Sequence, residues 1–386
     1  MPQILLYAEL LLNIRTVSLT ATLQTESNKE TKASLSADGE TISLTHDGET
    51  ASIRLPTKIS GGGAALTLPA APAKELTLRL QLEEDRPGLL KLGSSGRGSQ
   101  NHVPWSASAL NGRDVRVYCA SRGCEQELVK KGAIGEGAWK DLPNENWAEM
   151  MDFWHCHKPD HGHGAGDERG KGRGYAAASR LTARAGTGFV DLAHFLLKEE
   201  DCCGVKSDTE RKPSQLQQLT CLRCGALVGT VDERAEGFKL WKWAVVLSFG
   251  GEPPKQYSIQ KWVSAQLLSL IENEGVRKFV VSDASADVDD CKECLMLWVF
   301  TPDLSFSSSK HQEERDDPTR AMKIFWKDAP EEVESSFSSE ELALPSPVFG
   351  ALRTALRGSA ELLPASAREF QDWSVGFLER FTDDEG

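Results

Sequence analysis

The sequence predicts a β-rich α+β protein with an antiparallel sheet in its N-terminal region, a cysteine-rich β region at its centre and a C-terminal α+β portion. Three observations support this fold class. Short runs near the N-terminus alternate between apolar and polar residues, seven of the nine cysteines lie centrally, and helical and strand-like patterns alternate after residue 250. We therefore expect three regions, 1–112, 113–250 and 251–386, with a flexible insertion rich in glycine and histidine at 161–174.

The composition argues against two classes of function. A formal charge of −13 over 386 residues disfavours sequence-independent nucleic-acid binding, which needs a basic face. The apolar N-terminus is interrupted by Glu9 and Asn13, well short of the roughly 20 residues that cross a bilayer, and it lacks the basic start and cleavage site of a signal peptide. We expect no direct contact with nucleic acid or membrane. The odd number of cysteines fits free thiols and metal ligands in the reducing cytoplasm and nucleus.

The N-terminal region shows the two-residue period that half-buried strands require. The run 75–82 places four leucines on one face, and the run 17–21 alternates in the same way. Asp38-Gly39 and Asp47-Gly48 separate further short runs, as hairpin turns do. These features predict an antiparallel sheet that serves as a scaffold.

The later strands and helices are predicted from periodicity and from capping residues. Ser258 and Gly275 bound a helix with apolar residues at helical spacing, and Ser346-Pro347 caps and opens a second helix. The run 307–318 is polar, and we expect it to be mobile. Apolar runs predict strands at 189–197, 238–247, 278–282, 295–300 and 322–326.

Two cysteine pairs give the clearest chemical signal. Cys119 and Cys124 enclose four residues, Cys221 and Cys224 enclose two, and a glycine adjoins each pair. Zinc takes four soft or borderline ligands in a tetrahedron, and two such pairs brought together by strands supply them. The spacing predicts a zinc-knuckle region with a structural zinc, because four protein ligands leave no position for water. The alternatives are separate buried cysteines, or a redox dithiol at Cys221 and Cys224.

The other cysteines give weaker signals. Cys202 and Cys203 are adjacent, and neighbouring cysteines rarely bridge one another. Cys291 and Cys294 have knuckle spacing, but no second pair lies near them in the sequence. We expect buried or incidental thiols at these four positions.

The stretch 141–160 is dense in aromatic and ligand-capable residues. Trp147 and Trp154 fall, with two methionines, on one face of a predicted short helix that a proline ends. The helix would deliver Cys156 and His157 at its far end. One interpretation is an amphipathic core helix; the other is a presented peptide or a contributor to a metal site. No phosphate-binding glycine motif or serine-centred elbow accompanies it, so no catalytic residue is assigned.

The order of these features resembles that of one family. A β-rich region and a cysteine pair precede an L-P-x-x-N-W segment that ends in W-x-C-H, and a C-x-x-C pair follows. The likeness continues in KIFWKD at 323–328 and LLP at 362–364. Over most of its length the chain resembles the HECT-like ubiquitin-conjugating-enzyme-binding proteins. The residues that carry the resemblance are Leu142, Pro143, Asn146, Trp147, Trp154, Cys156, His157, Cys221 and Cys224.

The resemblance implies a ubiquitin-protein ligase or ligase-like adaptor that binds a ubiquitin-conjugating enzyme and promotes ubiquitin transfer to protein substrates, a cyclin-type protein among them. A HECT-type mechanism carries ubiquitin on a C-terminal cysteine, yet no cysteine follows Cys294. This departure disfavours a covalent intermediate. The candidate contacts for the conjugating enzyme include Trp241 and Trp243, because exposed aromatic residues suit a binding hot spot; core packing is the alternative.

A second function follows from the same resemblance. Some members of the family are associated with pre-messenger-RNA 3′-end processing, and their W-x-C-H segment is similar to one that enters the metal centre of a metallo-β-lactamase-type nuclease. By that resemblance Cys156 would offer a thiolate to the partner's zinc. The chain would then be a binding partner or regulator of the nuclease rather than an enzyme.

Overall fold

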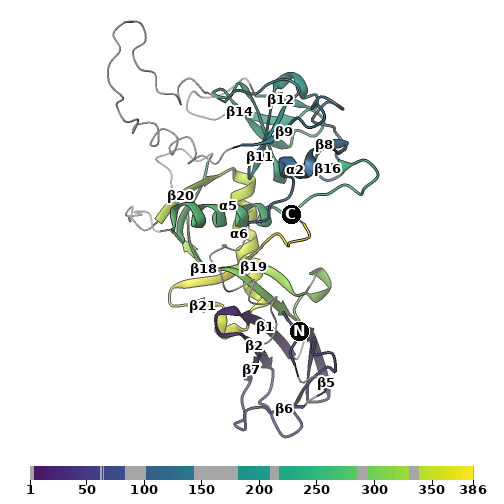
Figure 1. The fold of residues 1–386 in the computed structure, drawn as a ribbon. Helices are drawn as coiled ribbons and strands as arrows, with labels where there is room; N and C mark the ends of the chain where they lie inside the picture. Colours follow the sequence, from purple (N-terminus) through teal and green to yellow (C-terminus); the bar gives the residue numbers. More distant parts are fainter. Residues whose placement is uncertain are drawn as a thin grey trace, which may run out of the picture. The chain divides into compact units, whose positions relative to one another are not determined.

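Two compact units are formed by different parts of the chain in the structure, which is a computed structural model (Figure 1). Residues 1–102 and 259–385 form the first, here called the sandwich unit, and residues 103–258 form the second, here called the cysteine unit. In the described part of the chain, no helix is long and apolar enough to span a membrane. The structure describes residues 4–60, 63, 65–82, 101–142, 181–208, 217–284, 294–315, 317–329 and 339–385.

The main sheet of the sandwich unit joins strands from both ends of the chain. Its nine described strands run β21-β22-β19-β18-β1-β2-β7, with β17 beside β18 and β20 beside β17. β1 pairs antiparallel with β18, so that Tyr7 lies opposite Ser308. The β17–β20 pair is parallel. The strands are β1 (Ile4–Leu11), β2 (Thr16–Leu23), β7 (Glu75–Gln81), β17 (Lys278–Asp283), β18 (Leu295–Ser308), β19 (Thr319–Asp328), β20 (Ser339–Leu344), β21 (Glu369–Phe370) and β22 (Trp373–Glu379).

A four-stranded sheet packs against the N-terminal strands of the main sheet. Apolar side chains from β1, β2 and β7 meet those of the smaller sheet in one continuous core, in which Leu6, Leu19 and Leu44 are fully buried. The alternation read from the sequence therefore buries one face of each strand, as predicted. The smaller sheet has the order β5-β4-β3-β6 and comprises β3 (Lys32–Leu35), β4 (Thr41–His46), β5 (Glu49–Arg54) and β6 (Ala65–Leu66).

Both predicted hairpin turns of the smaller sheet are confirmed. Asp38-Gly39 lies between β3 and β4, and Asp47-Gly48 lies between β4 and β5. In the second turn both residues have a positive φ, 49° and 81°, as two-residue hairpins of the favoured twist require. Glycine suits the second position because it adopts this conformation without a steric cost.

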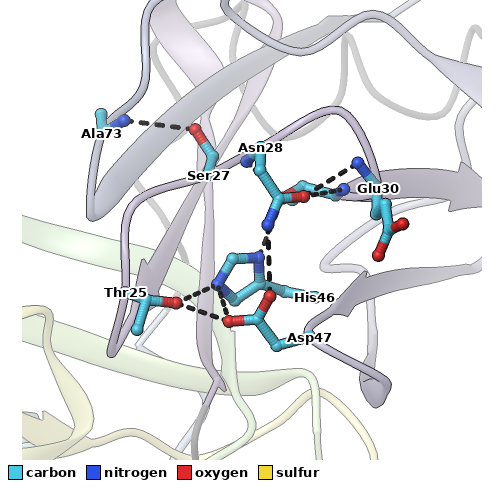
Figure 2. Close-up of polar contacts among 8 residues, drawn as sticks. Thr25, Ser27, Asn28, Glu30, His46, Asp47 and Ala73 are labelled. Atoms are coloured by element: carbon cyan, nitrogen blue, oxygen red, sulfur yellow. Dashed lines mark hydrogen bonds and ion pairs between the residues drawn. The ribbon is translucent and has the colours of Figure 1, made fainter.

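Polar contacts tie the loop after β2 to this second turn (Figure 2). Thr25 Oγ1 donates to Asp47 Oδ2 over 2.6 Å, and Asn28 Nδ2 donates to Asp47 Oδ1 over 3.2 Å. The hydrogen bond from Thr25 is the main influence that lowers the pKa of Asp47. The buried His46 ring lies between the hydroxyls of Thr25 and Thr31, at 2.7 and 2.9 Å. These contacts satisfy a polar ring that has little access to water.

Two helices, α5 (Ile259–Glu274) and α6 (Ser346–Ser359), pack on one face of the main sheet. α6 approaches β22 so closely that a Cβ on Gly376 would stand 2.6 Å from Leu356 O. Gly275 ends α5 with a φ of 71°, as predicted. The predicted cap at Ser346 is wrong, because its hydroxyl donates to Asp283 Oδ1 over 2.7 Å and no side chain caps the helix.

The cysteine unit contains two further sheets. Seven described strands run β12-β13-β14-β15-β11-β10-β9, and β16 pairs with β8. The run 238–247, predicted as one strand, is divided by η3 (Lys242–Ala244), and its second half joins the two-stranded β16–β8 sheet. The elements are α2 (Ala107–Leu110), β8 (Val115–Cys119), β9 (Trp139–Asp141), β10 (Gly188–Val190), β11 (His194–Leu197), β12 (Val205–Ser207), β13 (Gln218–Cys221), β14 (Leu227–Asp232), β15 (Gly237–Trp241) and β16 (Val245–Phe249).

The predicted fold class is confirmed in its main feature, a β-rich α+β fold with antiparallel sheets. The polar run 307–318 begins inside β18, where Ser307 and Ser308 are fully buried. The division into 1–112, 113–250 and 251–386 stays a prediction, and the insertion 161–174 lies outside the described residues. The remaining short helices are η1 (Leu12–Ile14), η2 (Glu199–Asp201), η4 (Gln312–Glu314), η5 (Ala360–Leu362) and η6 (Ala365–Ala367).

Candidate metal centre

Four cysteine sulfurs lie together in the cysteine unit. Cys119, Cys124, Cys221 and Cys224 place their Sγ atoms within 4.8 Å of one another. The Sγ–Sγ distance is 3.7 Å for Cys119 and Cys224, and 3.7 Å for Cys124 and Cys221. In a tetrahedral zinc–thiolate site with bonds of about 2.3 Å, the sulfurs stand about 3.8 Å apart. The two pairs that we predicted to share a metal are therefore at metal-binding distance.

The two cysteine pairs lie together because each begins at the end of a strand and backbone hydrogen bonds link the two strands. Cys119 ends β8, and Cys221 ends β13. Two segments link these strands: Leu128 N donates to Val117 O of β8, Cys203 N donates to Leu128 O, and Val205 lies opposite Cys221 in the β12–β13 pair. Backbone pairing thus holds the ends of β8 and β13 near one another.

Each cysteine pair closes around a tight turn whose glycine has a positive φ. The φ of Gly123 is 73° and that of Gly225 is 71°. Cys124 N donates to Ser121 O over 2.8 Å, and Gly225 N donates to Cys221 O over 2.9 Å. A Cβ built on either glycine meets nothing within 4 Å, so it is the backbone conformation rather than lack of space that favours glycine.

Backbone amides point at three of the four sulfurs. For Cys119, Cys124 and Cys224, the amide two residues further along donates to the sulfur and lowers the thiol pKa. Burial outweighs this at Cys119 and Cys124, whose pKa values are raised. At the exposed Cys224 the amide of Ala226 prevails and lowers the pKa to about 6. Amide donors of this kind stabilise the thiolate form, which is the form that binds zinc.

The donor set fits a closed structural site. Four thiols supply all the ligands of a tetrahedral zinc and leave no position for a catalytic water. The clustering excludes the alternative in which the four are separate buried cysteines. Within the described ranges, no other group of three or more histidine, cysteine, aspartate or glutamate side chains comes within metal-binding reach.

The remaining described cysteines stay apart from this cluster. Cys202 and Cys294 are buried, as expected, and burial raises the pKa of Cys202 to about 12. Cys203 is exposed, and its Sγ lies 3.4 Å from Glu127 O. Partial burial, and after it the charge of Glu127, raise the pKa of Cys203. Cys291 lies outside the described residues.

The predicted partner contacts divide into two groups. Trp241 and Trp243 stack on one another with ring centroids 5.4 Å apart and planes 18° apart, and both are half-buried. A half-buried stacked pair is compatible both with core packing and with contact to a conjugating enzyme, so the role of these tryptophans stays a prediction. The other candidates lie outside the described residues, and their roles stay predictions too: Trp147, Trp154, Cys156 and His157.

A buried lysine and a half-buried histidine lie beside the tryptophan pair, and the sequence patterns did not single them out. Lys242 Nζ donates to two backbone carbonyls, those of residues 104 and 105, over 3.3 Å each, and burial lowers its pKa to about 7. His194 Nδ1 lies 3.0 Å from Asp191 Oδ2, and burial lowers the pKa of His194 to about 4. His194 and Lys242 each lie within an apolar run that predicts a strand. A basic residue in such a run is the only sequence signal for either of them.

Comparison with known proteins identifies one family. A family model described as HECT-like ubiquitin-conjugating enzyme (E2)-binding matches residues 9–375. This match includes strands of both units and all four clustered cysteines.

Several relatives match at low identity over most of their length. An uncharacterised protein of Saccharomyces cerevisiae is 23% identical over 278 residues, which cover 71% of this chain and 72% of its own. One of Schizosaccharomyces pombe is 25% identical over 290 residues, with coverages of 72% and 78%. A Homo sapiens protein that is named as an E3 ubiquitin-protein ligase is 24% identical over 289 residues, with coverages of 68% and 72%. No solved structure matches the chain significantly.

Proposed function

The chain belongs to the HECT-like family of proteins that bind ubiquitin-conjugating enzymes, and from this premise we propose that it binds such an enzyme and promotes ubiquitin transfer to protein substrates. The family match over residues 9–375 carries the proposal, and it agrees with the resemblance drawn from the sequence. The name of the human relative, a ubiquitin-protein ligase, supports the transfer step.

The chain acts by holding the loaded conjugating enzyme rather than by carrying ubiquitin itself. A substrate amine attacks the thioester carbonyl on the conjugating enzyme, whose cysteine then leaves as a thiolate. A covalent relay would need a reactive thiol on this chain. Among the described residues the exposed thiols are Cys203, whose raised pKa disfavours a nucleophilic thiolate, and Cys224, which belongs to the sulfur cluster. No cysteine follows Cys294.

Zinc is the metal that the four clustered cysteines fit. Cys119, Cys124, Cys221 and Cys224 would hold it, and the bound ion would offset the charge of the buried thiolates and cross-link β8 to β13. Its role is to stabilise the cysteine unit, because the site has no position for a reacting group.

A discharge assay tests the proposed function. A panel of purified ubiquitin-conjugating enzymes is loaded with ubiquitin, and loss of each thioester to free lysine is followed with and without the full chain. We expect the chain to bind at least one member and to accelerate its discharge, with no reducible ubiquitin adduct on the chain. If no member binds or discharges faster, the proposal is wrong; a reducible adduct would instead establish the covalent route.

A further inference from the structure

One face of the main sheet carries an array of aromatic side chains, here called the aromatic face. It consists of Trp298, Phe300, Phe325, Phe370 and Trp373, from β18, β19, β21 and β22. Phe300 and Phe370 are 49% and 44% exposed, whereas Phe325 between them is buried. In the described part of the chain, these two are the exposed large apolar side chains that meet in one array.

The aromatic face lies on the side of the sheet opposite to the helices. Gly376 faces α6, and side chains alternate along a strand, so Val375 and Phe377 face the other way. Phe325 lies opposite Val375 in the β19–β22 register and shares their side. The β18–β19 register shifts between Val299 and Thr301, so Phe300 is the extra residue of a bulge. Phe300 follows Trp298 by two residues and therefore shares its side of the sheet, and its ring stacks on Phe325.

The exposed rings are held in place by the buried one. Phe300 stacks on Phe325 with centroids 4.7 Å apart and planes 13° apart, and Phe370 stacks on Phe325 at 5.1 Å and 23°. Trp298 packs edge-on to Phe325 at 5.4 Å. Rings that are already ordered lose little conformational entropy when a partner covers them. Rigid, centrally placed aromatic groups are the usual hot spots of protein interfaces.

Three lysines surround the rings, and their charges are not equally balanced. Lys323 Nζ pairs with Glu9, and Lys327 Nζ lies 2.6 Å from Asp372 Oδ2. Lys278 Nζ lies 5.5 Å from the Trp298 ring centre and has no carboxylate partner among the residues that the structure describes. A partner that covers the rings would therefore gain by presenting a carboxylate at Lys278.

We propose that the ubiquitin-conjugating enzyme docks on the aromatic face, with an apolar patch on Phe300 and Phe370 and a carboxylate beside Lys278. The inference rests on the proposed function, which supplies the partner. Phe300, Phe370 and Lys278 together define the surface that the conjugating enzyme must present: an apolar centre with an acidic residue at its edge. The docking site then belongs to the sandwich unit, whereas the candidate contacts Trp241 and Trp243 belong to the cysteine unit.

Binding measurements on the full chain test the docking site. The conjugating enzyme that the wild type binds most tightly in the panel is titrated against Phe300→Ser, Phe370→Ser and the double variant. We expect the double variant to bind at least about tenfold more weakly, as removal of a hot spot does. Lys278→Glu should weaken binding by about threefold or more, and added salt should reduce that difference. Ile14→Ser, which removes a side chain 57% exposed elsewhere in the sandwich unit, should leave the Kd unchanged.

The outcomes distinguish failure of the proposed docking site from failure of the proposed function. Thermal unfolding shows which variants keep the wild-type Tm, and Lys278→Glu, a surface change outside the ring stack, serves if a phenylalanine variant fails to fold. Binding within about twofold of wild type for folded aromatic-face variants overturns the docking site while leaving the function intact. Loss of binding in Trp241→Ala with Trp243→Ala, but not in Phe300→Ser with Phe370→Ser, also overturns it. Failure of the wild type to bind any conjugating enzyme contradicts both proposals.

Discussion

The two units of the chain differ in what they bury. Leu19, Ile42 and Leu44 lie in the core of the sandwich unit, and its buried Arg380 pairs with Asp303 at 2.9 Å. The cysteine unit also has apolar core residues, but it buries Lys242 among backbone carbonyls and gathers four thiols at one point. Apolar burial responds weakly to metal and pH, whereas thiolates and a buried lysine respond strongly. We therefore predict that the stability of the cysteine unit depends on metal and pH, whereas that of the sandwich unit does not.

Loss of a metal ligand should have the largest effect on the difference in stability between the two units. Cys221→Ser removes a buried thiol from the cluster, and structural zinc supplies on the order of 10 kcal/mol of apparent binding free energy. We expect zinc content, measured by elemental analysis, to fall from about one per chain to near zero. Limited proteolysis should then cleave within 103–258 and spare the sandwich unit. Cys203→Ser, outside the cluster, is the matched control, and a folded cysteine unit in metal-free Cys221→Ser would contradict the prediction.

The pH dependence of stability should differ between the units because of Lys242. Burial lowers its pKa from 10.5 to about 7, so between these values the unfolded chain binds a proton that the folded chain lacks. The contribution of Lys242 to the free energy of unfolding therefore rises with pH from 7 to 10.5, by about 1.4 kcal/mol per pH unit. Lys242→Met should flatten the slope of unfolding free energy against pH by that amount relative to wild type. Equal slopes in the two proteins would show that Lys242 keeps its proton when folded.

Two glycine substitutions should have the smallest effects, each on the unfolding midpoint of one unit only. Gly225 and Gly48 both have positive φ and open space at Cβ, so alanine strains the backbone by about 1 kcal/mol at either position without a clash. Gly225→Ala should lower the unfolding midpoint of the cysteine unit and weaken zinc binding. Gly48→Ala should lower only the midpoint of the sandwich unit, with zinc affinity unchanged. Equal effects of each on both midpoints would mean that the units unfold as one.

Features set by neighbouring residues were predictable from the sequence. The turn at Asp47-Gly48 and the cysteine pairs at 119–124 and 221–224 depend on short spacings, and the structure confirms their local geometry. The division of 238–247 was missed because an apolar run does not show that Trp241 and Val245 belong to different sheets.

Features set by distant residues were not predictable. The β1–β18 pair joins Tyr7 to Ser308, and no local pattern specifies a partner at such separation. The same holds for Ser346, whose hydroxyl donates to Asp283 instead of capping α6. It also holds for the aromatic face, because the strand-like run 295–300 does not show that Phe300 stacks on Phe325.

Hydrogen exchange on the full chain after zinc chelation tests whether the folding of the cysteine unit depends on its metal. We predict that amides of β8, β13 and β14 lose protection by several orders of magnitude, because the free energy of the cysteine unit depends on the four-thiol site. Amides of β1, β2 and β7 should keep the protection they have in the metal-loaded protein. Unchanged protection throughout 103–258 after complete removal of zinc would contradict the claim that the cysteine unit depends on its metal.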